Sequence, residues 1–378
     1  MRPRWLFTVG CLCVLLAQGQ TRKVDTTTFV VLGDGLAAGM GDFGLHEVWQ
    51  RGSFGAVAAQ LLGTIFPTPL MQAPGVGTPV GWPVQPARIP GRWQTGVRVE
   101  PVTLFVFNLS VPGMRIRDAV SRKPLPPLVQ PDDPFQTSLN LILGFPAMAL
   151  GAGKPLWSQL DYAVAMNPTL AVVALGYTEA CEAAVAGDAA LLPSPGDARS
   201  LYDLILTALA ANYSEQVVLT VPNPFDTAYF QPQPDGSYLA APALAYLASG
   251  EAVPEGARVS AEAAERIRDG VTAINREIAA AAAARNAVVV DLQELFAAWR
   301  RDGITAGTER LTAAYLGGIY NYSGFYPGLT AHAAIANRIV AEINRVYGRN
   351  FAAADLSRIV PTDPAARYRP TSAAERLR

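Results

Sequence analysis

The chain has 378 residues, of which 50% are apolar and only 16% are charged, a composition that suits a packed globular core and excludes an intrinsically disordered chain. The formal net charge is −1, and the only lysines are Lys23, Lys123 and Lys154. Because no basic run could follow a phosphate backbone, the sequence argues against nucleic-acid binding.

The start of the chain has the pattern of a secretory signal peptide, predicted over residues 1–19. Arginines precede an apolar stretch at 6–16, and small residues follow it as a cleavage site. The stretch is much shorter than the roughly 20 residues that cross a bilayer, so no transmembrane anchor is expected. We therefore expect a secreted or periplasmic protein, with lipoprotein anchoring at Cys11 or Cys13 as a minor alternative.

Removal of that signal leaves Cys181 as the one remaining cysteine. The mature chain therefore has no internal disulfide and no cysteine zinc site. Cys181 falls at a predicted helix start, where we expect a small buried apolar side chain rather than a reactive thiol.

Compact apolar runs predict strands at 28–32, 103–107, 170–175, 216–221 and 287–290. These runs are continuous rather than alternating. Both faces of each strand are therefore expected to be covered, as in a parallel sheet flanked by helices.

Helical spacing appears between and after these strands, first at 55–62. From Ser260, a candidate N-cap, apolar residues recur along one stripe at positions 267, 271, 274 and 278. The pattern returns over 331–347. Strand and helix in repeated order predict a doubly wound α/β architecture.

One domain is predicted over 28–347. Stretches rich in proline and glycine near 67–96, 124–155 and 222–254 are expected to be loop insertions on that domain rather than linkers. The polar segment 361–378 is predicted to be a disordered tail.

Two segments that follow predicted strands carry a resemblance to a known family. Residues 33–36 (GDGL) resemble the GDSL block of the SGNH hydrolases, a family of bacterial secreted acyl-hydrolases, in which the third residue is the serine nucleophile. Here that residue is Gly35. Residues 108–113 (NLSVPG) resemble the second block, whose glycine gives a backbone N–H to the oxyanion hole, and Gly113 matches it.

The later blocks follow in family order. Residues 175–179 (LGYTE) resemble the third block, with Thr178 in place of the asparagine that donates to the oxyanion and Glu179 in place of an aspartate. Residues 317–327 resemble the last block, with Ser323 in place of the aspartate and Tyr326 in place of the general-base histidine. The resemblance covers 28–347 and implies the SGNH-hydrolase (flavodoxin-like) fold, three α/β/α layers around a parallel sheet.

The same substitutions argue against ester hydrolysis. Acyl transfer by this route needs a hydroxyl nucleophile, a base and oxyanion donors. Gly35 has no side chain, and a tyrosine hydroxyl such as that of Tyr326, with an ordinary pKa of about 10, is a poor base at neutral pH. The resemblance still implies that Gly35, Gly113, Thr178, Ser323 and Tyr326 converge at the carboxyl edge of the sheet.

Three residues could carry relocated catalysis: Ser110, His46 and His332. For each we favour a plain role. Ser110 is expected to bond local backbone in its turn. His46 is expected to be a solvent-exposed or capped loop histidine, and His332 to lie without catalytic duty in the first turn of the last helix.

Asp34 and Glu179 could suggest a carboxylate pair. Asp34 is instead expected to tie its turn through backbone hydrogen bonds, and Glu179 to favour a helix dipole. No cofactor is expected, and no metal site, because too few further ligands are present.

These observations favour a pseudo-hydrolase that binds a lipid, acyl or glycan ligand in the ancestral cleft. That cleft is predicted to be formed by Asp34, Gly35, Ser110, Gly113, Tyr177, Thr178, Phe325 and Tyr326. Whether aromatic side chains line it or fill it stays open. One alternative is an active esterase or lipase with relocated residues. The other is a structural or partner-binding envelope protein whose insertions, with Trp82 and Trp93, form the contact surface.

Overall fold

Four of the five apolar runs predicted as strands form one parallel sheet in the computed structural model, with strand order β1-β2-β3-β7. These strands are β1 (Phe29–Gly33), β2 (Leu170–Ala174), β3 (Glu215–Leu219) and β7 (Val288–Val290). Every residue of β1 and β2 is buried, which explains why their sequences are apolar without alternation.

The structure describes residues 23–77, 98–99, 105–150, 156–244, 246, 250–367 and 369. The predicted signal peptide and both insertion tryptophans, Trp82 and Trp93, lie outside the described residues. Within them, no helix is long and apolar enough to cross a membrane.

The fifth predicted strand is displaced along the chain. Backbone hydrogen bonds join Val31 N to Phe107 O and Leu109 N to Val31 O, both at 2.9 Å, and Val111 N to Gly33 O at 3.1 Å. Residues 107–111 therefore run parallel to β1 on the side away from β2, whereas the prediction was 103–107, of which 103 and 104 lie outside the described residues. The apolar run misled because Phe105 is not buried: its side chain is 64% exposed.

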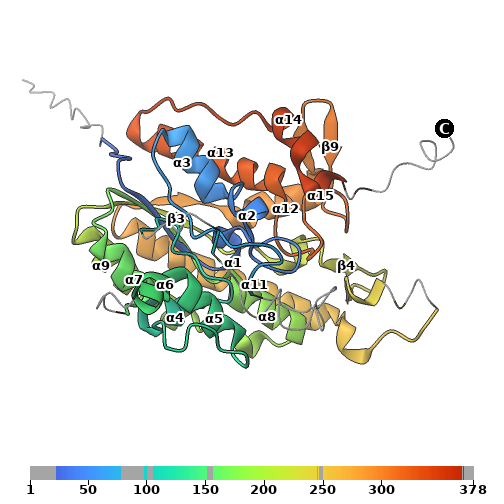
Figure 1. Cartoon of the computed structure of the whole chain (residues 1–378). Helices are drawn as coiled ribbons and strands as arrows, with labels where there is room; N and C mark the ends of the chain where they lie inside the picture. Colours follow the sequence, from blue (N-terminus) through green and yellow to red (C-terminus); the bar gives the residue numbers. More distant parts are fainter. Residues whose placement is uncertain are drawn as a thin grey trace, which may run out of the picture.

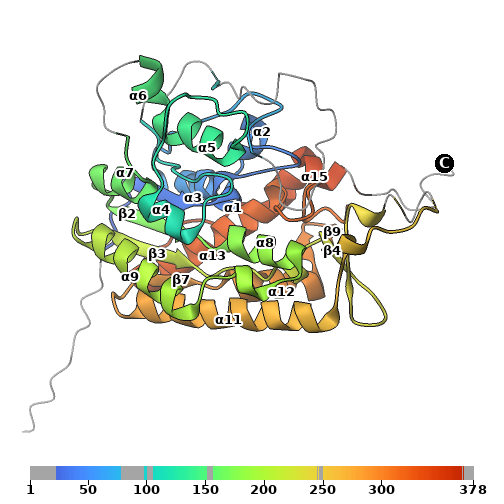
Figure 2. The same ribbon diagram turned by 90° about the horizontal axis from the view of Figure 1, so that it is seen from below.

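Helices cover both faces of the sheet, so the predicted three-layer α/β/α architecture is confirmed (Figures 1 and 2). One face carries α3 (Phe54–Leu62) and α13 (Leu329–Tyr347), which pack on each other. The other face carries α4 (Ile116–Ser121), α7 (Gln159–Ala165), α8 (Tyr177–Ala186), α9 (Pro195–Ala210) and α11 (Ala261–Ala283). The segment 107–111 forms one edge of the sheet, so β1 is an interior strand. The connection from β1 to 107–111 contains α3 on one face of the sheet, and the connection from 107–111 to β2 contains α4 and α7 on the other face.

Helix α11 forms as its sequence predicts. The Ser260 hydroxyl accepts a hydrogen bond from Ala263 N at 3.2 Å and caps the first turn. The stripe of Ile267, Val271, Ile274 and Ile278 is buried against the neighbouring layers. Cys181 is likewise buried, in α8, as predicted.

Shorter elements occupy the connections. The further α-helices are α1 (Gly35–Ala38), α2 (Glu47–Gln50), α5 (Pro134–Leu139), α6 (Phe145–Leu150), α12 (Leu292–Asp302), α14 (Leu356–Ile359) and α15 (Pro364–Arg367). A π-helical segment, η1, spans Asn140–Gly144, and 3-10 turns are η2 (Ala189–Leu191), η3 (Pro224–Asp226), η4 (Glu255–Ala257) and η5 (Val360–Thr362). Two small antiparallel sheets are formed by β4 (Phe230–Pro232), β5 (Tyr238–Ala240) and β6 (Arg258–Val259), and by β8 (Ile304–Ala306) and β9 (Glu309–Leu311).

Two of the predicted loop insertions contain regular structure. The described part of 124–155 holds α5, η1 and α6, and 222–254 holds two strands of the antiparallel sheet. Proline and glycine mark where these elements end, but they do not exclude short helices and strands between them. The first insertion is irregular over 67–77, and most of its remainder lies outside the described residues.

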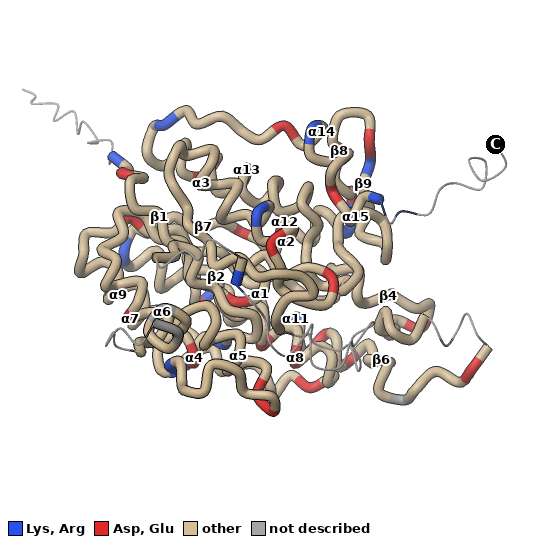
Figure 3. The backbone as a smooth tube through the Cα atoms, in the orientation of Figure 1, with Lys and Arg blue, Asp and Glu red and all other residues tan. Residues whose placement is uncertain are grey.

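Basic and acidic residues are interspersed along the described chain (Figure 3). Most of their ion pairs join partly exposed side chains, as in the pair between Arg115 and Glu182 at 2.9 Å. Pairs of this kind contribute little to stability. Charge therefore does not single out one face of the described chain.

The predicted tail is ordered at its start, contrary to expectation. Residues 361–367 complete η5 and form α15, and Asp363 is fully buried. Its carboxylate accepts hydrogen bonds from Thr330 N at 2.7 Å and from Ala365 N at 2.9 Å. The N-cap of α13 is Gly328, which has no side chain, so Asp363 supplies the missing acceptor from outside the helix. Polar composition alone did not reveal this role.

Asp363→Ala is therefore expected to lower the free energy of unfolding by about 2 kcal/mol, because two buried N–H groups lose their acceptor. Urea denaturation checks this. Asp355→Ala removes an exposed cap from α14 and serves as the control, with an expected cost of at most about 1 kcal/mol. Equal effects of the two substitutions would contradict the assigned role.

Candidate functional site

The candidate site lies where the chain leaves the carboxyl ends of β1 and β2. In open α/β sheets this is the edge at which ligands bind, at the point where successive crossovers change face. β1 leads to Asp34 and α1, and β2 leads through Gly176, at φ 108°, into α8. The two turns are therefore neighbours.

Asp34 ties these turns together. Its carboxylate accepts hydrogen bonds from Leu36 N at 3.0 Å and from Thr178 N at 3.1 Å. This agrees with the structural role expected for it and extends that role to the turn after β2. Asp34 is buried, so its oxygens face backbone donors rather than solvent.

Gly35 and Tyr326 are the two residues that the resemblance aligns with the nucleophile and the base of the SGNH hydrolases. A Cβ atom added to Gly35 would lie 2.7 Å from the Tyr326 hydroxyl and 3.1 Å from its Cζ. These separations are too short for ordinary contact. The tyrosine hydroxyl therefore takes the space that a serine side chain would need, and the two family-equivalent residues lie in direct contact, as the block order implied.

Tyr326 is held rigidly in this position. Its ring packs edge-on against that of Tyr177, with ring centres 6.1 Å apart and planes at 78°. Its carbonyl accepts a hydrogen bond from Asn321 N at 3.0 Å. Burial raises the pKa of the Tyr326 hydroxyl well above its ordinary value, so this group stays protonated and does not act as a base.

Ser323 organises the turn before Tyr326. Its hydroxyl donates to the Asn321 side-chain oxygen at 2.6 Å and accepts from the backbone N–H groups of Phe325 and Tyr326, both at 3.3 Å. These bonds are internal to the segment. Ser323 therefore shapes the turn and carries no charge that could orient a base.

Aromatic side chains fill the space beside this turn. The Tyr177 hydroxyl donates to Phe325 O at 2.8 Å, and the Phe325 ring stacks on Tyr229 with ring centres 4.0 Å apart. Of the eight residues predicted to form a cleft, all except Gly113 are buried. Around Tyr177 and Leu36 the described residues leave a cavity of about 10 Å³, room for no more than one water. Of the two alternatives that the sequence left open, the packing of these residues favours aromatic side chains that fill the space rather than line a cleft.

Gly113 and Ser110 follow the edge segment 107–111. Gly113 has φ 82°, a conformation that favours glycine, and a Cβ there would lie 3.2 Å from the Phe135 ring. Ser110 differs from expectation, because its buried hydroxyl makes no hydrogen bond within the described residues. The turn is closed instead by Asn108, whose side-chain oxygen accepts from Ser110 N at 3.2 Å.

Neither histidine is hydrogen-bonded to the Ser110 hydroxyl. His332 is buried between α13 and α3, where its Nδ1 accepts from Phe54 N at 3.3 Å, and burial lowers its pKa to about 3. His46 is half-buried rather than exposed and starts α2 without a capping bond from its side chain. Burial lowers its pKa as well.

Glu179 lies in the first turn of α8, as expected, and it also makes a contact that was not predicted. It is buried, and its Oε1 accepts a hydrogen bond from Ile116 N at 2.8 Å at the start of α4, while Oε2 has no partner within the described residues. Burial raises the pKa of Glu179 to about 8 and that of Asp34 to about 7, and the Asp34 carboxylate adds to the rise at Glu179. No group of three metal-ligating side chains is found among the described residues.

Two residues that tie the site together were not predicted. Asn321 is buried and donates to Met40 O at 3.3 Å, which joins the last block to the loop after α1. Gln159 donates to Gly33 O at 2.8 Å and to Leu109 O at 2.9 Å, and so bridges β1 and the edge segment. Their bonding partners lie far away in sequence, so no local pattern marks them.

The chain matches no protein-family model, and no curated protein matches it. Solved structures similar to it include an extracellular lipase from Streptomyces rimosus, with 14% identity, coverage of 85% of this chain and 99% of that chain, and a TM-score of 0.40. An acetylxylan esterase from Geobacillus stearothermophilus has 11% identity, coverage of 88% and 100%, and a TM-score of 0.42. A GDSL-like lipase candidate from Parabacteroides merdae has 10% identity, coverage of 87% and 98%, and a TM-score of 0.39. Such likenesses concern the fold alone.

Proposed function

We propose that this chain is a secreted, SGNH-type protein that acts by binding and does not hydrolyse esters. The observation that carries the proposal is the contact between Gly35 and Tyr326. The position of the nucleophile has no side chain, and the phenol of Tyr326 lies within 2.7 Å of the point where one would begin. Secretion is supported by the signal-like pattern of residues 1–19.

The size of the catalytic loss supports this proposal. In subtilisin, loss of the nucleophile or the base alone lowers turnover by about 10⁶. Here the nucleophile position is glycine, the base position is a buried phenol, and Ser323 is bonded within its own turn. Relocated catalysis would need a base beside a free hydroxyl. His332, the more deeply buried histidine, bonds to Phe54 N instead.

A lipid, acyl or glycan ligand was expected over Gly35. The packing of Tyr177, Phe325 and Tyr326 supports a binding site elsewhere on the fold, because these side chains pack together beside Gly35. A protein that acts by binding needs the folded scaffold and does not need the catalytic groups.

The purified mature protein is expected to show no hydrolysis of short-chain acyl esters above background. A quadruple variant, Gly35→Ser with Thr178→Asn, Ser323→Asp and Tyr326→His, is expected to gain measurable activity, because histidine is shorter than tyrosine and leaves room for the new serine. Gly35→Ser alone is expected to stay inactive, since it lacks a base. A chromogenic ester assay with thermal melting curves for each protein provides the measurement.

Parent activity that survives purification and disappears in Ser110→Ala would overturn the proposal and favour relocated catalysis. A quadruple variant that folds as stably as the parent and remains inactive would show that the aromatic packing, and not only the missing groups, prevents catalysis.

A further inference from the structure

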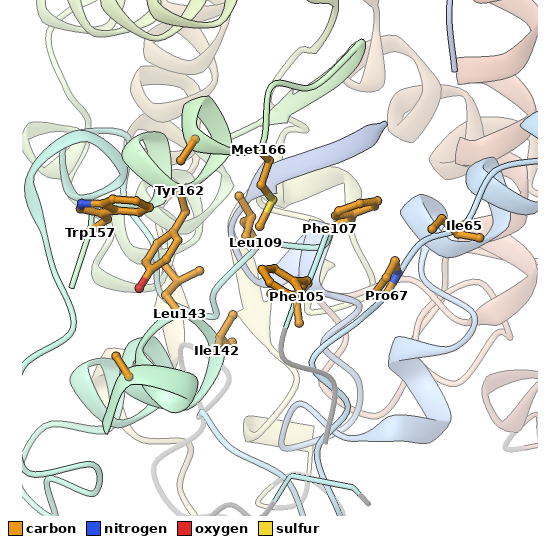
Figure 4. A pocket seen from close by; sticks show the side chains of 13 residues that line it. Ile65, Pro67, Phe105, Phe107, Leu109, Ile142, Leu143, Trp157, Tyr162 and Met166 are labelled. Carbon is orange, nitrogen blue, oxygen red and sulfur yellow. The ribbon is translucent and has the colours of Figure 1, made fainter. Parts of the chain in front are cut away.

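A large cavity lined by described residues lies away from Gly35, beside the edge segment 107–111. It has a volume of about 730 Å³, within the range of small-molecule sites, which is roughly 300–1,000 Å³. Its walls come from the loop after α3, from η1 and α6, and from α7 (Figure 4). In that view the labelled lining side chains extend from Trp157 at one end to Ile65 at the other, and we call this cavity the trough.

The lining is almost wholly apolar. Of its thirteen side chains only those of Trp157 and Tyr162 carry a nitrogen or oxygen atom, and their rings pack edge-on with centres 5.3 Å apart at one end. Two large apolar side chains of the lining are also exposed, Ile65 at 71% and Phe105 at 64%. Large apolar side chains exposed around an apolar hollow indicate a binding surface. A glycan or nucleotide would find few hydrogen-bonding groups here.

A second hollow adjoins the first. It is an open groove of about 640 Å³ over α7 and α9, and it shares Trp157 and Ala165 with the trough. Among the described residues Lys123 is the one cation that lines either hollow, and no ion pair of its side chain is found there. Asp161, the other charged residue of the groove, accepts a hydrogen bond from Ser158 N at 3.2 Å. The pair of hollows thus offers an apolar trough that leads to an unpaired positive charge.

We propose that this trough binds one alkyl chain of a fatty-acid-type amphiphile, with the chain between Trp157 and Ile65 and the carboxylate beside Lys123. Burial of an alkyl chain is favourable in proportion to the length of the chain, and its methylene groups need no polar partner. Its narrow, linear shape fits an elongated hollow, and its head is complementary to the lysine. This inference does not depend on the lost chemistry at Gly35, so either proposal can fail alone.

Titration of the full mature chain with cis-parinaric acid, a fluorescent fatty acid, tests the site. Saturable fluorescence enhancement is expected, with displacement by palmitate. Ala165 is exposed and lines both hollows, so Ala165→Phe blocks their junction and is expected to weaken binding at least about tenfold. Ala210→Phe, on the exposed part of α9 and outside both hollows, is the matched control and is expected to bind like the parent.

The position and head group are tested separately. A brominated stearate is expected to quench tryptophan fluorescence in the parent and not in Trp157→Phe. Lys123→Gln is expected to weaken the binding of palmitate by about threefold and to leave the binding of hexadecanol unchanged. Lys23→Gln is expected to change neither affinity. Absence of saturable binding, or equal binding by parent and Ala165→Phe, overturns the site. Equal palmitate affinity in parent and Lys123→Gln overturns the assigned position of the carboxylate.

Discussion

Glu179→Gln is expected to raise the free energy of unfolding at about pH 8.5 by about 2–3 kcal/mol and to leave it nearly unchanged at about pH 4.5. Glutamine keeps the oxygen that accepts the hydrogen bond from Ile116 N and removes the buried charge. The side chain is 6% exposed, and its second oxygen has no partner in the described part of the chain. An ionised carboxylate in that place is therefore destabilising.

The direction follows from the pKa. Burial raises the pKa of Glu179 from its ordinary value of 4.5 to about 8, so the folded state holds a proton that the unfolded state releases. The stabilising contribution of the protonated form is complete below about pH 4.5 and is lost as the pH rises through about 8. A difference of this size corresponds to about 5 kcal/mol. Relaxation and water entry reduce the cost of a buried charge, so we expect about half of it.

Urea denaturation at a series of pH values measures this effect. Glu262→Gln is the control, because Glu262 is an exposed acid in the first turn of α11 and is not among the charges that act on Glu179. Its substitution is expected not to reproduce the gain in stability at high pH. Parallel pH curves for the parent and Glu179→Gln would show that Glu179 is not the buried acid responsible.

Gly35→Ala is expected to lower the free energy of unfolding by about 2 kcal/mol, because the new Cβ would meet the Tyr326 hydroxyl at 2.7 Å. Backbone strain is not the reason, since Gly35 lies in α1 and is not among the residues with positive φ. The Tyr326 ring cannot yield easily, because Tyr177 packs against it and both residues are buried.

A double-mutant cycle with Tyr326→Phe isolates this contact. Phenylalanine removes the nearest clashing atom, so Gly35→Ala is expected to cost about half as much in that background, with a coupling energy of about 1 kcal/mol. Gly196→Ala is the matched control in the first turn of α9, where the nearest atom is 4.0 Å from the added Cβ. Alanine there is expected to stabilise by about 0.5–1 kcal/mol. Additive effects at positions 35 and 326 would contradict the filled site.

The sheet could be predicted from the sequence to a large extent. The runs that form β1, β2, β3 and β7 are apolar because both faces of each strand are covered. Each strand shows this apolar pattern in its own short sequence, so it can be recognised locally. The apolar stripe of α11 can likewise be recognised within one segment. Strand pairing cannot, because it joins distant segments: the run at 103–107 resembled the other strands, but residues 107–111 make the hydrogen bonds to β1.

The candidate site was predicted only in part. The order of the blocks predicted that Gly35 and Tyr326 lie at the same edge of the sheet, and the two residues are in contact there. Whether the vacated space is open or filled depends on side-chain volumes contributed by distant segments, such as Tyr229 against Phe325. The contact of Glu179 was missed for the same reason, because its partner, Ile116 N, lies 63 residues earlier.

No sequence pattern predicted the trough at the edge segment. Its walls come from separate stretches of chain, and each contributes only ordinary apolar residues such as Ile142 and Met166. A hollow arises where such residues fail to meet, which is a property of their arrangement and not of any single stretch.

The interior position of β1 has a consequence for the order in which the protein folds. During synthesis β1 emerges first, yet one neighbour, 107–111, appears much later and the other, β2, later still, since Thr28 and its partner Thr169 are 141 residues apart. The emerging chain therefore exposes an unpaired apolar strand for a long interval. Closure of such long loops slows folding, and unpaired strands are where newly made chains aggregate. We expect this fold to need protection of its first strand until β2 has been made.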